Sequence, residues 1–421
     1  MMKAIALNYR PGFYERKILN ALQQMPLGSL HISLLDGQVM QTGNGEDQTR
    51  AEIHIKDPRF FRHAVLYGDI GFGEAFTEGW WETPDITAVI QWFLLNIDQA
   101  PSVSGSKVKS YALNLLGYFN RIYHRNHANS LSGSRKNIAE HYDLHNDFFA
   151  LFLDPSMTYS SAYFRDEAMN LQEAQMAKYE RLASRLRLHP GDHVLEIGSG
   201  WGGNAIYMAR KYGCKVTSIT ISREQWKLAR ERVEAAGLSE LVSIELTDFR
   251  EIKGNYDKIV SIEMLEAVGH EFLEIYFKRC HELLKKGGLL VIQVITCPDS
   301  RYDSLRNGVD WIQKHIFPGT LLPSVSAINK AVNNTGDLSL IDLKEIGLHY
   351  AKTLSSWKQS FNTRLDDVRK MGFDEVFIRK WNYYFSYCEA AFRMRNIYVM
   401  QLLYSRPNNL LLGTPVPTVI G

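Results

Sequence analysis

Residues 194–204 read VLEIGSGWGGN, and this stretch decides the fold of the chain. A short apolar run leads into a turn that holds four glycines, and a helix-like run follows over residues 205–212. Glycine adopts φ > 0 readily and has no Cβ to block the close approach of a ligand. A strand, a glycine turn and a helix in this order offer bare backbone N–H groups. The sequence therefore predicts a ligand-binding loop here.

The loop alone leaves two cofactor classes open, because Gly198-x-Gly200-x-x-Gly203 also fits the dinucleotide-binding fingerprint. That fingerprint expects an acidic residue at the end of the next strand, to hold a ribose. The next predicted strand, residues 215–221, ends without one, and the acid lies instead at Glu196, inside the first strand. Glu196-x-Gly198-x-Gly200 resembles the first motif of S-adenosylmethionine-dependent methyltransferases. A tight turn that only packs helix on strand is the structural alternative.

Composition and charge exclude several classes of protein. Hydrophobic residues make up 45% and charged residues 22% of the chain, as in ordinary soluble globular proteins. The net charge of +2 gives no sign of nucleic-acid binding. The four cysteines lack pair spacing, so neither a metal site nor a disulfide framework is expected, and reducing cytosol is the natural compartment. The N-terminus does not resemble a signal peptide, and no stretch approaches the 18 apolar residues of a membrane span.

The length of 421 residues predicts two or three domains. Residues 1–100 are expected to form a small α/β unit. Its elements are strands at 29–39 and 51–56 and helices at 60–67 and 85–97. Residues 101–138 have Ser- and Gly-containing ends around an apolar, basic helix-like run. Such a helix lies on an anionic lipid surface or docks on its own protein, and the sequence leaves both readings open.

From about residue 139 a second domain begins, in which apolar strands alternate with helices. The expected strands are 194–197, 215–221, 242–246, 258–262 and 289–294, and helices lie near 205–212, 223–236 and 271–285. This alternation predicts a parallel sheet that is covered by helices on both faces. After Pro298 mostly helical segments are expected, among them one long aromatic helix over residues 379–404.

Ligands on sheets of this kind bind at the carboxyl ends of the strands. Four segments follow strand ends and are therefore expected around one site: residues 198–203, 220–225, 248–250 and 262–266. Some residues in them have plainer roles as well, since Ser222 can cap the helix that follows it and Asp248 can cap a turn.

These motifs and their flanking segments resemble the cyclopropane-fatty-acyl-phospholipid synthases and the related mycolic acid cyclopropane synthases, over nearly the whole chain. The ordered blocks are GFGEAFTEGWW at 71–81, HYDLHNDFFALFLDPSMTYSSAYF at 141–164, EIGSGWGG at 196–203, TISREQ at 220–225, SIEMLEAVGHE at 261–271, IFPGTLLPS at 316–324 and LHYAKTL at 348–354. The resemblance implies an α/β fold. Residues 139–421 would form a Rossmann-like methyltransferase domain with C-terminal helices, and residues 1–100 a small lipid-binding domain.

By that resemblance the cofactor is S-adenosylmethionine. Its expected contacts are Tyr159 and Ser160 at the methionine end, Gly198 and Gly200 for close backbone approach, Thr220 and Gln225 for the ribose, Asp248 and Phe249 for the adenine, and Ile262 near the sulfonium. Glu196 and Ser222 complete the expected cofactor-binding set, and no metal is expected.

The implied reaction is methyl transfer to a cis double bond of a phospholipid acyl chain, followed by loss of a proton from that methyl to close a cyclopropane. Because the transfer leaves a carbocation, the site must be dry, with negative charge or aromatic faces near the cation. Glu266 is the expected central carboxylate, with a solvated carboxylate at a helix start as its structural alternative. Tyr350 is the expected site tyrosine.

The resemblance further implies a bound bicarbonate that serves as the base. In the family it is held by a Cys after the Tyr-Ser pair, by the Glu, by a His late in the sheet and by the Tyr. Here the Cys position is Ser161 and the His position is Gln293. Both side chains can hydrogen-bond but neither can carry charge. Bicarbonate use and the ring-closing step therefore stay open.

Three rival functions also stay open. The first is a lipid methyltransferase of the same family with a methyl-branched or methylene product. The second is a non-catalytic lipid-binding homologue. The third is an NAD-dependent oxidoreductase, which the missing acid after the second strand disfavours. The expected partners are unsaturated phospholipid acyl chains and the inner face of the membrane, to which a cytoplasmic protein would bind peripherally. Relatives suggest a homodimer.

Overall fold

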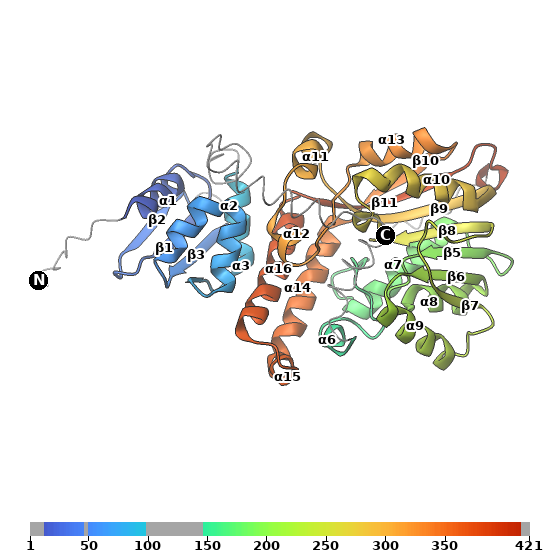
Figure 1. Cartoon of the computed structure of the whole chain (residues 1–421), viewed down its shortest axis with the longest axis horizontal. Coiled ribbons are helices and arrows are strands. Elements are labelled where there is room, and N and C mark those ends of the chain that lie inside the picture. The colour runs from blue at the N-terminus through green and yellow to red at the C-terminus, as the bar shows by residue number, and fades with distance from the viewer. Residues whose placement is uncertain (1–11, 46–48, 98–145, 414–421) are drawn as a thin grey trace, which may run out of the picture. The chain divides into compact units, whose positions relative to one another are not determined.

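The computed structural model describes residues 12–45, 49–97 and 146–413 (Figure 1). The chain divides into two compact units. The first consists of Met1–Arg121, Asp310–Ile312 and Leu365–Met394, and the second of Ile122–Val309, Gln313–Arg364 and Arg395–Gly421. The whole of the expected basic segment 101–138, and the predicted boundary at residue 139, lie in the stretch 98–145, outside the described residues.

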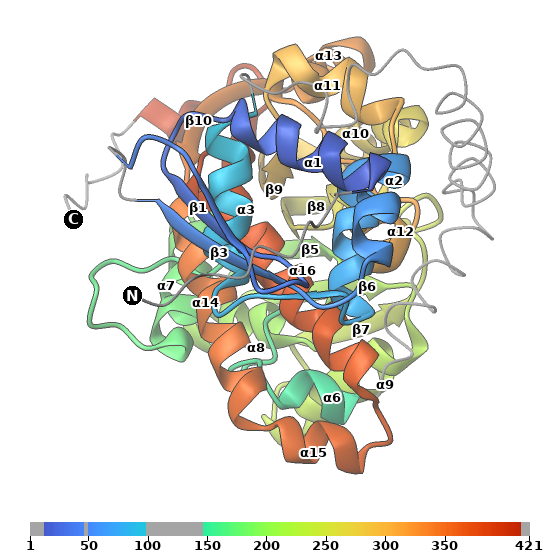
Figure 2. The same ribbon diagram turned by 90° about the vertical axis from the view of Figure 1, so that its left-hand side faces the viewer.

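The first unit contains a four-stranded sheet with the order β2-β1-β3-β4. Its strands are β1 Ser29–Ser33, β2 Val39–Thr42, β3 Arg50–Ile55 and β4 Trp81–Glu82, and its helices are α1 Phe13–Gln23, α2 Arg59–Thr77, α3 Ile86–Leu95, α15 Leu365–Lys370 and α16 Glu375–Arg393. β1 runs parallel to β3 and antiparallel to β2. Figure 2 shows β1 and β3 side by side. The predicted strand over 29–39 is interrupted by a turn at Gly37, which has φ +83°.

Helix α2 takes in most of the GFGEAFTEGWW block, which the sequence left unassigned. It is kinked at Gly68, where φ is +59°. A Cβ on Gly73 would lie 2.6 Å from the ring of Trp311 and 2.8 Å from that of Tyr383, so only glycine fits there. Thr87 of α3 donates to Glu389 of α16 at 3.0 Å. Residues 365–394, which the sequence placed with the catalytic domain, thus pack with the first unit.

The second unit contains a seven-stranded sheet with the order β10-β11-β9-β8-β5-β6-β7. Its strands are β5 His193–Ile197, β6 Lys215–Thr220, β7 Val242–Leu246, β8 Tyr256–Ile262, β9 Leu284–Thr296, β10 Ser339–Glu345 and β11 Tyr398–Ser405. Neighbouring strands from β7 to β9 are parallel. The five predicted strands are parallel, as expected, and the structure adds β10 and β11. β11 is antiparallel to both β9 and β10, so the complete sheet is mixed.

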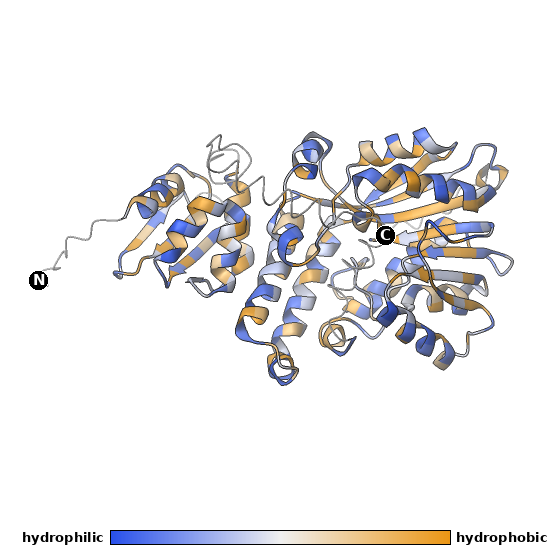
Figure 3. Cartoon of the chain, viewed as in Figure 1, coloured by the Kyte–Doolittle hydropathy of each residue, from blue (hydrophilic) through white to orange (hydrophobic). Residues whose placement is uncertain are grey.

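Helices cover both faces of this sheet, as predicted. They are α7 Leu171–Leu186, α8 Gly203–Tyr212 and α9 Arg223–Ala235 on one face, and α10 Leu273–Leu283 and α13 Val325–Thr335 on the other. Successive residues of β5 point to opposite faces of the sheet, and each face has its own hydrophobic core. Val194 packs with α8 and α9, and Leu195 packs with α10 and α13. The strands carry long apolar runs because both of their faces are buried (Figure 3).

The prediction of one long helix over residues 379–404 is wrong. Helix α16 ends at Arg393, Arg395 adopts φ +51°, and residues 398–405 form strand β11. Val399, Leu402 and Tyr404 are fully buried in that strand. Aromatic and β-branched side chains suit a strand as well as a buried helix, and the pairing with β9 decides between the two.

Two further helices complete the surroundings of the site. They are α6 Asn146–Ala150 and α14 Gly347–Thr363, both in the second unit. Within the described ranges, no helix is both long enough and apolar enough to cross a bilayer.

Candidate active site

The glycine loop connects β5 to α8 and is anchored to the neighbouring strand. Gly198 and Gly200 have φ values of +96° and +47°. The backbone N–H groups of Gly198 and Ser199 both donate to the carbonyl of Ile219 in β6, at 3.0 and 2.9 Å. A Cβ on Gly200 would meet no atom within 4 Å, so the loop has an open side at this residue. A ligand can therefore approach the backbone there.

Glu196 supports this loop from within the protein. Its side chain is buried, and its two oxygens accept hydrogen bonds from Asn204 Nδ2 at 2.8 Å and from Ser218 Oγ at 2.5 Å. Burial raises the pKa of Glu196 to about 7, and the two hydrogen bonds oppose that shift. The sequence predicted Glu196 as a cofactor-binding residue, and these contacts favour a positioning role that ties β5 to α8 and β6.

The end of β6 brings together the three residues that were predicted there. Thr220 Oγ1 donates to Gln225 Oε1 at 2.9 Å and accepts from the Ser222 N–H at 3.1 Å. Ser222 Oγ accepts from the Gln225 N–H and caps α9. The amide oxygen of Gln225 is thereby held, whereas its NH₂ group has no partner among the residues that the structure describes and can donate to a ligand.

Asp248, which follows β7, is held by Arg250. Its Oδ1 accepts from Arg250 Nε at 2.7 Å and its Oδ2 from Arg250 Nη2 at 2.7 Å. The guanidinium also lies over the ring of Phe249, 5.2 Å from its centroid. Because both carboxylate oxygens are engaged, the half-buried Phe249 is the better candidate for an adenine contact. Ile262, at the end of β8, is half-buried against the α8 face of the core.

The Tyr159–Ser161 segment faces buried charged residues. Ser160 Oγ accepts from Lys178 Nζ at 2.7 Å. Burial lowers the pKa of Lys178 to about 7, although nearby carboxylates, with Glu263 first among them, oppose the shift. Ser161 turns its hydroxyl to the carbonyl of Ala162 and its backbone N–H to Glu263 Oε1 at 2.8 Å. The hydroxyl that replaces the family's thiol therefore does not point toward the carboxylate.

Glu263 is the site residue that sequence reasoning missed. It directly follows β8, its φ is +49°, and its N–H donates to the carbonyl of Gln293 at 2.7 Å. Its half-buried carboxylate accepts from Ser161 N, from Gln293 Nε2 at 2.8 Å and from the Tyr350 hydroxyl. Burial raises its pKa, and these donors and Lys178 lower it. An acid at the end of a strand was a visible signal, but the resemblance directed attention to Glu266.

Glu266 lies one turn further on, in the 3-10 helix η1 Leu265–Ala267, and is buried. Its Oε1 accepts from the N–H of Ile295 at 2.5 Å, and its Oε2 has no partner within the described part of the chain. Burial raises the pKa of Glu266 to about 8, and the charge of Glu263 raises it as well. Glu263 has more hydrogen-bond donors than Glu266, so the geometry favours Glu263 as the carboxylate of the pair that carries the negative charge.

Gln293 and Tyr350, both predicted, converge on Glu263. Gln293 is fully buried in β9, and Tyr350 is buried on α14. The two carboxylates and the glycine loop are neighbours, because a Cβ on Gly198 would lie 3.2 Å from Met264, the residue after Glu263. The structure thus brings together Ser161, Gln293, Tyr350 and Glu266 around a carboxylate that the sequence analysis did not name.

Aromatic rings line the same region. The ring of Tyr159 lies 5.2 Å from that of Trp357 and 5.3 Å from that of Phe149, and Trp357 meets Tyr350 edge-on at 5.8 Å. Trp357 and Phe149 are fully buried. Such rings exclude water and present negative faces to a cation.

The pH dependence of stability offers a test of the Glu266 environment. A glutamate in an unfolded chain titrates near pH 4.3. Between about pH 4.3 and about pH 8 the folded protein binds more protons at Glu266 than the unfolded chain does, so its contribution to stability falls as pH rises.

The glutamine in Glu266→Gln is neutral at every pH, so the variant is expected to lack the fall in stability that Glu266 causes as pH rises. The difference in unfolding free energy between variant and parent should grow by up to a few kcal/mol from about pH 5 to about pH 8, because one pKa unit corresponds to about 1.4 kcal/mol. Urea unfolding at both pH values measures it. An equal change of unfolding free energy with pH in the variant and the parent would contradict the raised pKa of Glu266.

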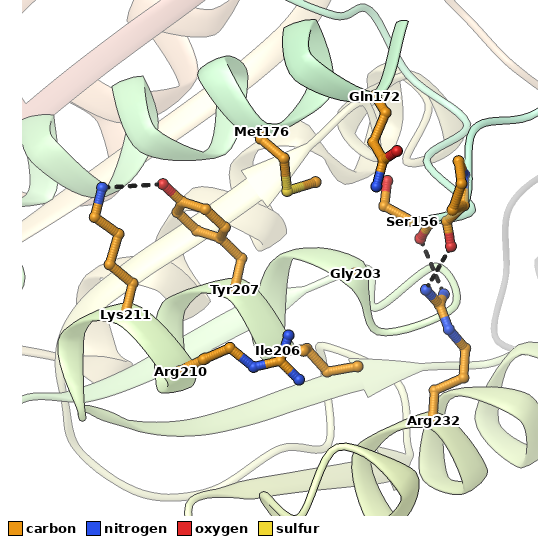
Figure 4. A pocket seen from close by; sticks show the side chains of 10 residues that line it. Ser156, Gln172, Met176, Gly203, Ile206, Tyr207, Arg210, Lys211 and Arg232 are labelled. Atoms are coloured by element: carbon orange, nitrogen blue, oxygen red, sulfur yellow. Dashed lines mark hydrogen bonds between the residues drawn. The ribbon is translucent and has the colours of Figure 1, made fainter.

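The pocket drawn in Figure 4 lies along α8, from Gly203 at its first residue to Lys211 near its end, and of the predicted segment 198–203 it includes only Gly203. It is lined by Pro155, Ser156, Gln172, Met176, Gly203, Ile206, Tyr207, Arg210, Lys211 and Arg232. None of the predicted site residues is among them. Arg232 donates to the carbonyls of Ser156 at 2.9 Å and Trp201 at 2.7 Å, so it braces the glycine loop from α9. Within the described residues, no group of three His, Cys, Asp or Glu side chains could hold a metal ion.

Comparison with known proteins finds relatives over most of the chain. The family model described as mycolic acid cyclopropane synthetase matches residues 129–402. The chain is 37% identical over 391 residues to tuberculostearic acid methyltransferase UfaA1 of Mycobacterium tuberculosis, covering 91% of this chain and 90% of that protein. It is also 37% identical over 362 residues to cyclopropane-fatty-acyl-phospholipid synthase of Escherichia coli, covering 85% and 88%.

Solved structures agree with these relatives. The mycolic acid cyclopropane synthase CmaA1, complexed with SAH and CTAB, superposes with a TM-score of 0.60 at 30% identity. The match covers 65% of this chain and 98% of CmaA1.

Proposed function

Because the chain belongs to the mycolic acid cyclopropane synthetase family, we propose that it transfers a one-carbon unit from S-adenosylmethionine to the cis double bond of an unsaturated phospholipid acyl chain and closes a cyclopropane through a carbocation. The observation that carries the proposal is the convergence of three features at one edge of the sheet. These are an open glycine loop, a wall of aromatic rings and a pair of carboxylates, of which Glu266 is buried and Glu263 is half-buried.

The residues at the glycine loop fit S-adenosylmethionine. Gly200 leaves room for close backbone approach, and Thr220 holds the amide oxygen of Gln225, which leaves its NH₂ group to donate to a ribose hydroxyl. We assign Tyr159 and Ser160 to the methionine end, Gly198 and Gly200 to the backbone contact, Thr220 and Gln225 to the ribose, Phe249 with Asp248 to the adenine, and Ile262 to the neighbourhood of the sulfonium. When bound, this cofactor supplies an electrophilic methyl group.

The surrounding residues suit the chemistry that follows. An alkene is a weak nucleophile, so the acyl chain must be held in line with the methyl group. The rings of Tyr159, Trp357 and Tyr350 exclude water and face the positive charge that develops on the lipid. The Glu263 carboxylate, held by the donors Ser161 N and Gln293 Nε2, supplies negative charge that stabilises the same cation without reorganisation of solvent.

Incubation with S-adenosylmethionine and vesicles of an unsaturated phosphatidylglycerol, followed by mass and NMR analysis of the fatty acids, tests the proposal. We expect acyl chains that are heavier by one CH₂ and show the upfield proton signals of a cyclopropane. Vesicles of a saturated phospholipid are the control. An absence of product, together with an absence of S-adenosylmethionine binding by calorimetry, would favour a non-catalytic lipid-binding protein.

A methyl-branched or methylene product is the second candidate. It is favoured by the equal similarity, 37% identity in each case, to a tuberculostearic acid methyltransferase and to a cyclopropane synthase. The site geometry suits both outcomes, since each needs the same methyl transfer and differs in the proton that is lost. The NMR spectrum separates them, because a methylene product shows vinyl protons in place of the upfield signals.

Access to the lipid completes the proposal. We propose that the protein is cytoplasmic and binds peripherally to the inner face of a membrane, as a homodimer. The support is the nature of the substrate and the basic, apolar composition of residues 107–125, which lie outside the described residues. Sedimentation with anionic and with neutral vesicles tests the binding, and it should weaken with added salt. Light scattering measures the oligomeric state.

A further inference from the structure

The carboxylate of Glu263 is surrounded by hydrogen-bond donors, an arrangement that makes this side chain a fixed anion of the site. Ser161 N and Gln293 Nε2 both donate to its Oε1 at 2.8 Å, and the Tyr350 hydroxyl donates to the same carboxylate. The side chain is held to the sheet at its base by the bond from its own N–H to the Gln293 carbonyl. The residue as a whole is half-buried.

A chain of hydrogen bonds orients the Gln293 amide toward this carboxylate. Arg181 Nε donates to Gln401 Oε1 at 2.7 Å, Gln401 Nε2 donates to Gln293 Oε1 at 2.9 Å, and Gln293 Nε2 donates to Glu263. A guanidinium can only donate and an ionised carboxylate can only accept. Each of the two amides therefore has its oxygen toward Arg181 and its NH₂ group toward Glu263. The charge of Arg181 polarises these hydrogen bonds along the chain.

The second carboxylate supports the ionised state of Glu263. Glu266 lies beside it, and the Glu266 Oε2 atom is buried without a partner within the described residues, as suits a protonated acid. Two adjacent carboxyl groups in a buried site share one negative charge. Glu263 has three donors and Glu266 has one, so the charge stays on Glu263.

The residues of this site do not fit a separate bicarbonate. The Ser161 N–H, the Gln293 amide and the Tyr350 hydroxyl, which the resemblance assigns to that anion, are engaged by Glu263. A further anion would also bring a second negative charge next to Glu263 in a poorly solvated site.

We propose that the Glu263 carboxylate is the catalytic base, which takes the proton released from the methylated acyl chain, and that turnover needs no bicarbonate. This inference rests on the proposed function. The alkene π electrons form the new bond to the methyl carbon while the sulfur–methyl bond breaks and its electron pair stays on sulfur. A C–H bond of the new methyl then breaks, its electron pair closes the ring onto the cationic carbon, and the proton passes to Glu263. Glu263 releases that proton to solvent before the next cycle.

Glu263→Gln tests the proposal, with the exposed helix residue Glu234→Gln as the matched control. Glutamine keeps the shape of the side chain but cannot take a proton. We expect kcat to fall about 100-fold or more, as is usual for loss of a general base, while the Kd for S-adenosylmethionine stays within about twofold. The fraction of water-trapped, hydroxylated product should rise, which a merely structural defect would not cause.

A second variant and an omission experiment complete the test. Glu263→Gly suits the positive φ at this position and frees the three donors. Added bicarbonate or formate should restore part of its turnover, whereas neither should change the parent enzyme or Glu234→Gln.

The outcomes separate the two claims. If the parent protein forms no product from S-adenosylmethionine and unsaturated phospholipid, the proposed function fails and this inference fails with it. If the parent is active but Glu263→Gln is equally active, or if the bicarbonate-depleted parent is stimulated by bicarbonate, only the assignment of Glu263 is overturned.

Discussion

Replacement of Gly200 by valine is expected to abolish S-adenosylmethionine binding while the protein still folds. A Cβ at this position meets no protein atom within 4 Å, so the added side chain enters the open side of the glycine loop without disturbing the core. The backbone has φ +47°, and an L side chain there costs about 1–2 kcal/mol. The side chain would occupy the space through which a ligand reaches the backbone, and we expect affinity to fall by roughly 100-fold or more.

Gly237→Val is the matched control for this variant. Gly237 has φ +68°, and a Cβ there would also meet no atom within 4 Å. Gly237 follows the C-terminal end of α9, whereas Gln225 lies in the first turn of that helix. It should lower the melting temperature as much as Gly200→Val does and bind S-adenosylmethionine normally. Calorimetric titration and thermal unfolding measure the two effects. If Gly200→Val binds with the parent's affinity, the cofactor does not contact this loop.

Replacement of Trp357 by alanine is expected to lower the free energy of unfolding by about 3–5 kcal/mol, the usual range for a buried tryptophan. The residue is fully buried on α14, and its ring contacts those of Tyr159, Phe152 and Tyr350 at centroid distances of 5.2, 6.1 and 5.8 Å. The cavity would also admit water to the site, so the variant should lose turnover even at temperatures at which it is folded.

Trp357→Phe distinguishes the contribution of the aromatic ring to stability from that of the indole N–H group. The indole N–H has no hydrogen-bond partner among the described residues, and an unpaired buried donor is itself unfavourable. Phenylalanine keeps an aromatic ring and removes that donor, so it should cost less than half of what alanine costs. Urea unfolding followed by circular dichroism compares the variants. Equal losses for alanine and phenylalanine would show that the ring contacts do not stabilise the unit.

Sequence reasoning succeeded where short-range pattern and chemistry coincide. The run from Val194 to Gly203 predicted a strand, a turn and a helix, and the structure has β5, the glycine loop and α8. The expected gathering of strand ends follows from the same logic, because parallel strands bring their carboxyl ends to one edge. Ser222 was weighed as a helix cap, and it caps α9.

Sequence reasoning is insufficient where the structure or role of a residue depends on partners that are distant in the sequence. Residues 398–404 carry aromatic and apolar side chains that suit a buried helix or a strand, and only the pairing with β9 makes them a strand. The choice between Glu263 and Glu266 as the central carboxylate depends on distant partners in the same way, and the role of Glu266 stays a prediction. Two glutamates three residues apart look alike in sequence, and the donors that distinguish them come from Ser161, Gln293 and Tyr350.

The amino-acid sequence by itself determined the class of this protein: an α/β sheet with a glycine turn, flanked by motifs that together indicate methyl transfer to a lipid. These features are local, since a turn needs its glycines and a strand its apolar run wherever they lie in the fold. The tertiary structure alone decided which donors surround each carboxylate and what Gln293 contributes. Burial and hydrogen bonds set ionisation, and the chain from Arg181 through Gln401 joins residues that are more than 200 positions apart in sequence. The position of a charge in the site is therefore a property of the folded protein.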